Sequence, residues 1–146
     1  MAQGFTREKD SSIVILSNAI AESFSGQNKD VVTIHDGQAV AGDPSGTGVI
    51  LAIATGVATQ AVGLATADVA VGFSTLYQVQ GLFNLADWSN VTGSTSLLPL
   101  ATYYLDTTSG MLTTSAPVVP GQIVQIIGVA VDPQTLELKL DQTVLL

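Results

Sequence analysis

The chain has no cysteine among its 146 residues. Disulfides therefore play no part in its stability, which fits a reducing compartment without requiring one. A chain of this length buries roughly 68–70% of its unfolded surface, so neither a disulfide nor a metal is needed to hold it together. The length predicts one domain, or two small repeats that share one core.

Charge is scarce, and positive charge is almost missing from most of the chain. Charged residues make up 11% of the sequence, against the usual ~25%. Positive and negative charges cancel up to Lys29, but from Asp30 onward nine acids stand against Lys139 alone, which gives −8. Such a body repels a phosphate backbone, so no nucleic-acid partner is expected. So few charges also indicate a surface that copies of the chain or another protein partly cover.

No run of residues is long and apolar enough to span a membrane. The most apolar region, Val49–Val71, is interrupted by threonine, glycine, glutamine and aspartate, whereas a spanning helix needs ~20 apolar residues. The opening "MAQGFTREKD" has no apolar segment after a basic one, so it does not resemble a secretory signal. The sequence predicts a soluble protein without a membrane partner.

The residues of common catalytic and metal sites are also few. His35 is the only histidine; with no second histidine and no cysteine, a zinc site is excluded. Its neighbour Asp36 would point to the opposite face of a strand, and no "G-x-S-x-G" motif supplies a nucleophile. Most aspartates stand beside Gly, Pro, Ser or Thr, where they cap turns. We therefore expect no enzyme, cofactor or metal. A small hydrolase using His35 and an oxygen-ligated calcium site remain the alternatives.

Aromatic residues are few, which limits carbohydrate binding. A sugar-binding face normally presents several exposed aromatic rings, and here Trp88, Tyr103 and Tyr104 are the candidates. Core packing or subunit contact is the favoured role for these three residues. If Tyr103 and Tyr104 are strand neighbours, one faces the core and the other faces solvent or a neighbouring subunit.

Valine, threonine and closely spaced glycines dominate the sequence and favour strands. The alternating "TLELKLD" and the apolar "QIVQIIGVAV", joined by "DPQT", predict a hairpin over Ile123–Leu140. The other expected strands are Val31–His35, Val49–Ala54, Ala61–Thr66, Thr75–Gln80, Tyr103–Asp106 and Met111–Thr114. "NLADWSN" (84–90) is expected to be a loop or one helical turn with Trp88 beneath it. The predicted fold is all-β, as a barrel or sandwich.

The first thirty residues differ from the rest and are predicted to form an arm. "SSIVILSNAIAESFSG" (11–26) has a serine N-cap and a glycine stop that favour a short helix, although "IVIL" also permits a strand. The expected organisation is an arm at 1–30 and a β-domain at 31–146.

The β-domain contains two short segments of similar sequence, which we call the internal echo. "QAVGLA" (60–65) matches "QIIGVA" (125–130) at its glutamine, glycine and alanine positions. A turn-rich hairpin precedes each match and an alternating strand follows it, with spacings of 65 residues at the first match and 60 at the second. Two similar small β-units, at about 31–82 and 97–146, would produce this pattern.

One further pattern resembles a module of tailed-bacteriophage virion proteins. Its recurring features are "G-x-x-YYL-x-x-x-x-G-x-LT-T", then "VQ-x-IG-x-A" and "L-x-L". Here they correspond to Tyr103–Leu105, Gly110–Thr114, Val124–Ala130 and Leu136–Leu138. The first glycine is absent, and Leu100 or Ala101 stands there. The likeness covers about residues 38–140.

Such modules occur in head decoration (cement) proteins and in head or tail fibres. The short chain without a repetitive shaft favours the first. The resemblance then implies a homotrimer, made in the host cytoplasm, that binds the major capsid protein on the outer capsid surface of the virion and stabilises the shell. The alternative is a fibre module that binds a host-surface glycan. Phe5, Arg7, Lys9 and Phe24 are the candidate contacts to the shell or to a neighbouring protomer.

Overall fold

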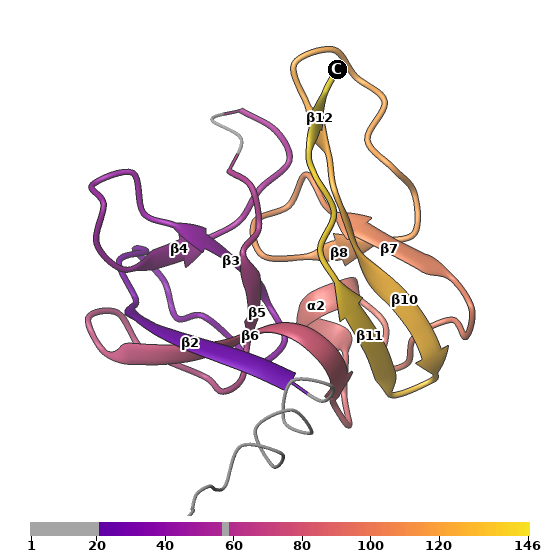
Figure 1. Cartoon of the computed structure of the whole chain (residues 1–146), viewed down its shortest axis with the longest axis horizontal. Helices are drawn as coiled ribbons and strands as arrows, with labels where there is room; N and C mark the ends of the chain where they lie inside the picture. Colours follow the sequence, from indigo (N-terminus) through magenta and orange to yellow (C-terminus); the bar gives the residue numbers. More distant parts are fainter. Residues whose placement is uncertain (1–20, 57–58) are drawn as a thin grey trace, which may run out of the picture.

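The computed structural model describes residues 21–56 and 59–146, and nearly all its regular structure is β (Figure 1). The all-β prediction is confirmed. The described elements are β2 Ala21–Gln27, β3 Ala39–Gly42, β4 Val49–Leu51, β5 Gly63–Ala65, β6 Ser74–Asn84, α2 Ser89–Thr92, β7 Thr102–Leu105, β8 Leu112–Thr113, β9 Ile123–Val124, β10 Ile126–Asp132, β11 Thr135–Lys139 and β12 Val144–Leu145.

The strands form one large curled sheet and one small ribbon. The sheet has the order β4-β3-β5-β6-β11-β10-β7-β8, with β2 added on β6, and β9 pairs with β12 in the ribbon. Figure 1 shows two lobes, β2 to β5 on one side and β7 to β12 on the other, with α2 inside the curl. The result is a half-closed barrel rather than a flat sheet.

The long strand β6 joins the two lobes. β2 pairs with residues 74–81 of β6, β5 pairs with Tyr77 and Gln78, and β11 pairs with residues 80–84. Because β2 overlaps both partners, β5 and β11 must lie one after the other on the opposite edge of β6. One strand therefore pairs with strands of both lobes.

The strand order is the same when it is followed from either end of the sheet. The series β4-β3-β5-β6 and β8-β7-β10-β11 have the same succession and the same antiparallel pairings. The two lobes are thus similar β-units that meet where β6 pairs with β11. This relation agrees with the echo in the sequence.

Two equivalent glycines show how closely the lobes correspond. Gly63 of β5 and Gly128 of β10 each lie against a backbone carbonyl of the next strand, that of Gln78 and that of Glu137. A Cβ atom at either glycine would collide with that carbonyl. Gln78 therefore corresponds to Glu137, and 137 − 78 gives a spacing of 59 residues. In the sequence, the similar strands "TLYQVQ" and "TLELKL" are 60 residues apart, one more than this structural spacing.

Two predictions about the N-terminal half are wrong. Helix was favoured for residues 11–26, but Ala21–Gln27 forms strand β2 on β6; residues 11–20 lie outside the described part. Val31–His35 is not a strand, and only an isolated bridge joins Ile34 to Val69.

Side-chain capping explains the missing strand. The Asn28 side-chain oxygen accepts the N–H of Asp30, and the Asp30 carboxylate accepts the N–H of Val31. These local bonds bend the chain before a ladder can form. β3, which pairs with β4 and β5, was also not predicted from the sequence.

The C-terminal half follows the prediction closely. β10 and β11 form the expected hairpin, and the Asp132 carboxylate accepts the N–H of Gln134 in its turn at 2.8 Å. β7 and β8 form the second expected hairpin. "NLADWSN" contains the end of β6 and leads into the single helical turn of α2.

The main core lies inside the curl of the sheet and draws on both lobes. Its members include Leu64, Trp88, Leu105, Ile127 and Leu136, all fully buried. A smaller cluster around Ile34, Val40 and Val49 fills the first lobe. A shared core of this kind makes the lobes one folding unit.

Candidate functional surfaces

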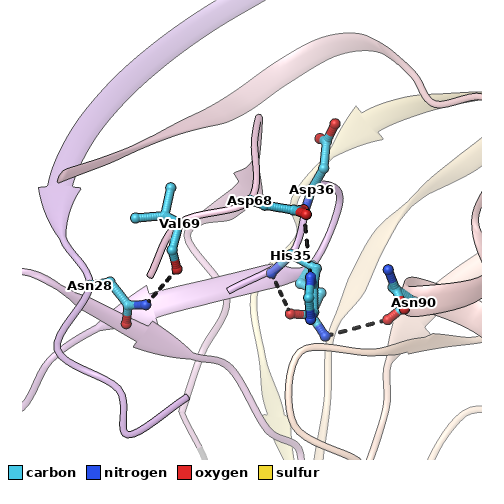
Figure 2. Close-up of polar contacts among 7 residues, drawn as sticks. Asn28, His35, Asp36, Asp68, Val69 and Asn90 are labelled. Atoms are coloured by element: carbon cyan, nitrogen blue, oxygen red, sulfur yellow. Dashed lines mark hydrogen bonds and ion pairs between the residues drawn. The ribbon is translucent and has the colours of Figure 1, made fainter. Parts of the chain in front are cut away.

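His35, the only histidine, lies in a polar cluster between two loops and α2 (Figure 2). Its Nδ1 atom is 3.6 Å from a carboxylate oxygen of Asp68. The same oxygen accepts the backbone N–H of Asp36 at 2.8 Å. Gln38 completes the cluster: its side-chain oxygen accepts the N–H of His35, and its amide donates to the Asn90 carbonyl.

This cluster positions loops and does not assemble a nucleophile. Burial raises the pKa of the Asp36 carboxyl, and the nearby Asp68 carboxylate raises it further. Among residues 21–56 and 59–146, the backbone N–H and carbonyl of His35 both bond to Gln38, and its Nδ1 atom has no hydrogen-bond partner. Within residues 21–56 and 59–146, no three His, Cys, Asp or Glu residues are grouped as metal ligands.

Several aspartates cap turns, as the sequence predicted, but Asp68 does not: its carboxylate accepts the N–H of Asp36, 32 residues away. Asp43, Asp87, Asp106 and Asp132 each accept a backbone N–H from one or two residues further on. These bonds lower the pKa of Asp87 and of Asp132, because the donated N–H stabilises the charged form.

Trp88 and Tyr103 are buried and cannot offer a sugar-binding platform. Trp88 is completely buried beside Phe83, and its indole N–H donates to the Gln134 carbonyl at 3.0 Å. The Tyr103 hydroxyl accepts the N–H of Leu98 at 2.9 Å, which ties β7 to the preceding loop. Tyr104 is half-buried. The two tyrosines therefore face opposite sides of β7, as expected.

Of the candidate contact residues near the N-terminus, only Phe24 is described. It is half exposed on β2 and contacts the Tyr77 ring at a centroid distance of 6.2 Å. Phe5, Arg7 and Lys9 lie outside the described residues.

Many of the exposed apolar side chains of the described structure lie in three regions, a feature that the sequence did not locate. The first lies around Asn28, whose backbone and amide bonds join its segments. The second covers the outer face of β6, β11 and β10, and the third covers the ribbon with its preceding loop. We call them the Asn28 surface (Val31, Val32, Val71, Phe73), the outer-sheet surface (Leu82, Leu100, Val129, Val131) and the ribbon surface (Val118, Val119, Val144, Leu145, Leu146).

A polar cavity of about 250 Å³ opens beside α2. Hydroxyl side chains of Thr92, Ser94, Ser96, Thr113 and Thr114 line it, together with Leu98, Tyr103, Asp106 and Leu112. His35 is not among its residues. The cavity therefore has hydrogen-bonding groups but no histidine and only one carboxylate.

Comparisons with known proteins give no family for this chain. No protein-family model matches it, and no curated protein matches it. In the described part, no helix is long and apolar enough to cross a membrane.

Proposed function

We propose that this chain is a bacteriophage capsid decoration protein, which binds the outer surface of the head as a homotrimer and stabilises the shell. The resemblance in the β7–β11 region suggests the class, and the three exposed apolar surfaces are the structural observation that supports it. An assembly protein touches several neighbours at once, both copies of itself and shell subunits. Several apolar surfaces on one small body suit that role.

The energetics favour many modest contacts. A surface with few charges costs little to desolvate, and threonine and valine pack well against a neighbouring strand or subunit. When a trimer engages several shell subunits together, the effective concentration of each further contact rises. Each contact can then be weak while the whole complex is stable.

The N-terminal arm is the part we expect to reach the major capsid protein. β2 adds to the outer edge of β6, so the arm joins the body at an edge of the sheet. Phe5, Arg7 and Lys9 give the arm an apolar anchor and two of the chain's four cationic side chains. Cations in the arm would be attracted to an acidic shell surface from which the acidic body is repelled.

Deletion of residues 1–12 tests this role. We expect the shortened chain to lose binding to purified heads, measured by co-sedimentation, while its oligomeric mass in light scattering stays unchanged. Heads decorated with the full chain should release DNA at a higher temperature than undecorated heads or heads mixed with the deletion variant. Full binding by the deletion variant would contradict the role of the arm, and absence of binding by the full chain would contradict the proposed function.

A fibre module that binds a host-surface glycan is the alternative. The hydroxyl-lined cavity beside α2 is the observation that favours it, because hydroxyls and Asp106 match the hydrogen-bonding groups of a sugar. The variant Ser96→Val should then reduce host adsorption. A chain that binds heads and leaves adsorption unaffected supports decoration instead.

A further inference from the structure

Leu100 has a left-handed backbone, which a turn holds in place: the N–H of Ala101 donates to the Leu98 carbonyl at 3.1 Å. Its φ angle is +68°, and it is the one residue other than glycine with a positive φ in residues 21–56 and 59–146. This conformation costs an L-residue about 1–2 kcal/mol, whereas glycine adopts it without that cost. The Leu100 side chain is 84% exposed, so it gains little from packing.

Leu100 lies next to β10, which contributes to the outer face of the sheet. Its N–H donates to the Ala130 carbonyl at 2.7 Å, which places its backbone beside the segment of β10 that carries Val129 and Val131. Val129 lies opposite Glu137 of β11, and Glu137 lies opposite Leu82 of β6. Residues directly opposite one another share a face of the sheet.

This face exposes apolar side chains as well as charged ones. Leu82 is 59% exposed and Val129 is 38% exposed, although polar side chains normally occupy such positions. Exposed apolar residues are ordinary when they are scattered, but here Leu82 and Val129 flank Glu137 on one face of the sheet. Both side chains are therefore open to a partner outside the protomer.

The charges on the same face indicate which partner fits. Glu137 and Lys139 are two residues apart on β11, so both point outward, and both are exposed. Lys139 is the only lysine or arginine after Lys29. A second copy presents the same acid and the same base, so Glu137 of one copy can meet Lys139 of the other. Elsewhere two bodies of −8 charge repel each other.

We propose that the outer-sheet surface is the contact between copies of this chain, with Leu100 as its anchor and the Glu137–Lys139 pair setting its orientation. The inference rests on the proposed function in that it supplies the self-contact that a trimer requires. Burial of the exposed Leu82, Leu100 and Val129 side chains against a neighbour would remove their apolar surface from water.

Leu100→Gly tests whether the Leu100 side chain contributes to self-association. The variant removes the side chain and relieves the strain, so its unfolding midpoint should rise when it is measured at a dilution where both proteins are monomers. Its self-association, measured by sedimentation equilibrium, should weaken by about tenfold or more. Val119→Ser, on the ribbon surface, is the matched control and should leave self-association unchanged. A rise in stability with unchanged association would overturn the inference.

Exchange of the two charges tests that the partner is a second copy. Glu137→Lys should weaken self-association because it places like charges in contact across the interface, and the double variant Glu137→Lys/Lys139→Glu should restore it. If the double variant associates no better than the single one, the pairing is wrong.

Co-sedimentation with heads separates this inference from the proposed function. A Leu100→Gly chain that is monomeric yet still binds heads weakly supports both. A native chain that self-associates through this face but never binds heads contradicts only the proposed function. A native chain that binds heads as a monomer contradicts this inference and the trimeric state in the proposed function, but not the binding to heads.

Discussion

Asp36 has a raised pKa with two identifiable physical causes. Its carboxyl is partly buried and lies near the Asp68 carboxylate, and both effects disfavour its charged form. The folded protein therefore binds a proton at Asp36 more tightly than the unfolded chain does. The charged carboxylate lowers stability at neutral pH, and this penalty disappears as the pH falls through the raised folded pKa toward the unfolded value of 3.8.

Asp36→Asn should consequently stabilise the protein at pH 7. The gain should be below about 1 kcal/mol, because the group is largely solvated, and it should vanish below the unfolded pKa. Urea unfolding at several pH values measures it. Asp132→Asn is the control with opposite sign, since the N–H of Gln134 lowers the pKa of Asp132 and favours its charged form. Destabilisation by Asp36→Asn at pH 7 would show that the carboxylate contributes an interaction that outweighs its repulsion.

His35 and Trp88 show what residue-level reasoning could and could not provide. The absence of a nucleophile motif and of a second histidine made a structural role for His35 the better prediction, and its bonds serve loops. Trp88 was expected under its loop, where it lies. The contact with Asp68, thirty-three residues away by 68 − 35, had no local signal. Side chains from distant loops meet only when the sheet curls.

At the scale of elements, hairpins were predictable and isolated strands were not. β10, β11 and their turn follow from alternation and from "DPQT", because each signal acts over a few residues. The β2 segment was expected to be helical because of its serine N-cap and glycine stop, whereas its pairing with β6 joins residues that are 47 to 60 positions apart. Tertiary pairing decides such segments.

The close approach of β10 to β11 at Gly128 also gives a prediction. Gly128→Ala should destabilise the protein by about 1–3 kcal/mol, because its Cβ atom would force β10 away from the Glu137 carbonyl of β11. Gly42 is the matched control: it also lies in a strand, and nothing lies within 4 Å of a Cβ atom there. Thermal unfolding of both alanine variants provides the measurement. Equal effects at the two positions would contradict the close approach.

At the scale of the whole molecule, the two similar units form one cooperative body. β6 pairs with strands of both lobes, and the buried Gln125 side chain connects the lobes by bonding both the N–H and the carbonyl of Ala61. The main core includes residues of both lobes.

We therefore expect a single unfolding transition. Far-ultraviolet circular dichroism should report the sheet, and fluorescence of Trp88, the only tryptophan, should report the shared core. Their transitions should coincide in urea. Two separated transitions would mean that the lobes fold independently in spite of the shared strand.

The sequence by itself determined the all-β class, the two C-terminal hairpins, the capping role of several aspartates and the internal echo, because each depends on patterns within a few residues or on similarity between two segments. Tertiary structure alone decided that β2 is a strand, that one long strand serves both units and that Leu82, Glu137 and Val129 share an outer face. Those features arise from pairings between distant residues. Local propensity does not determine which distant strand becomes a neighbour.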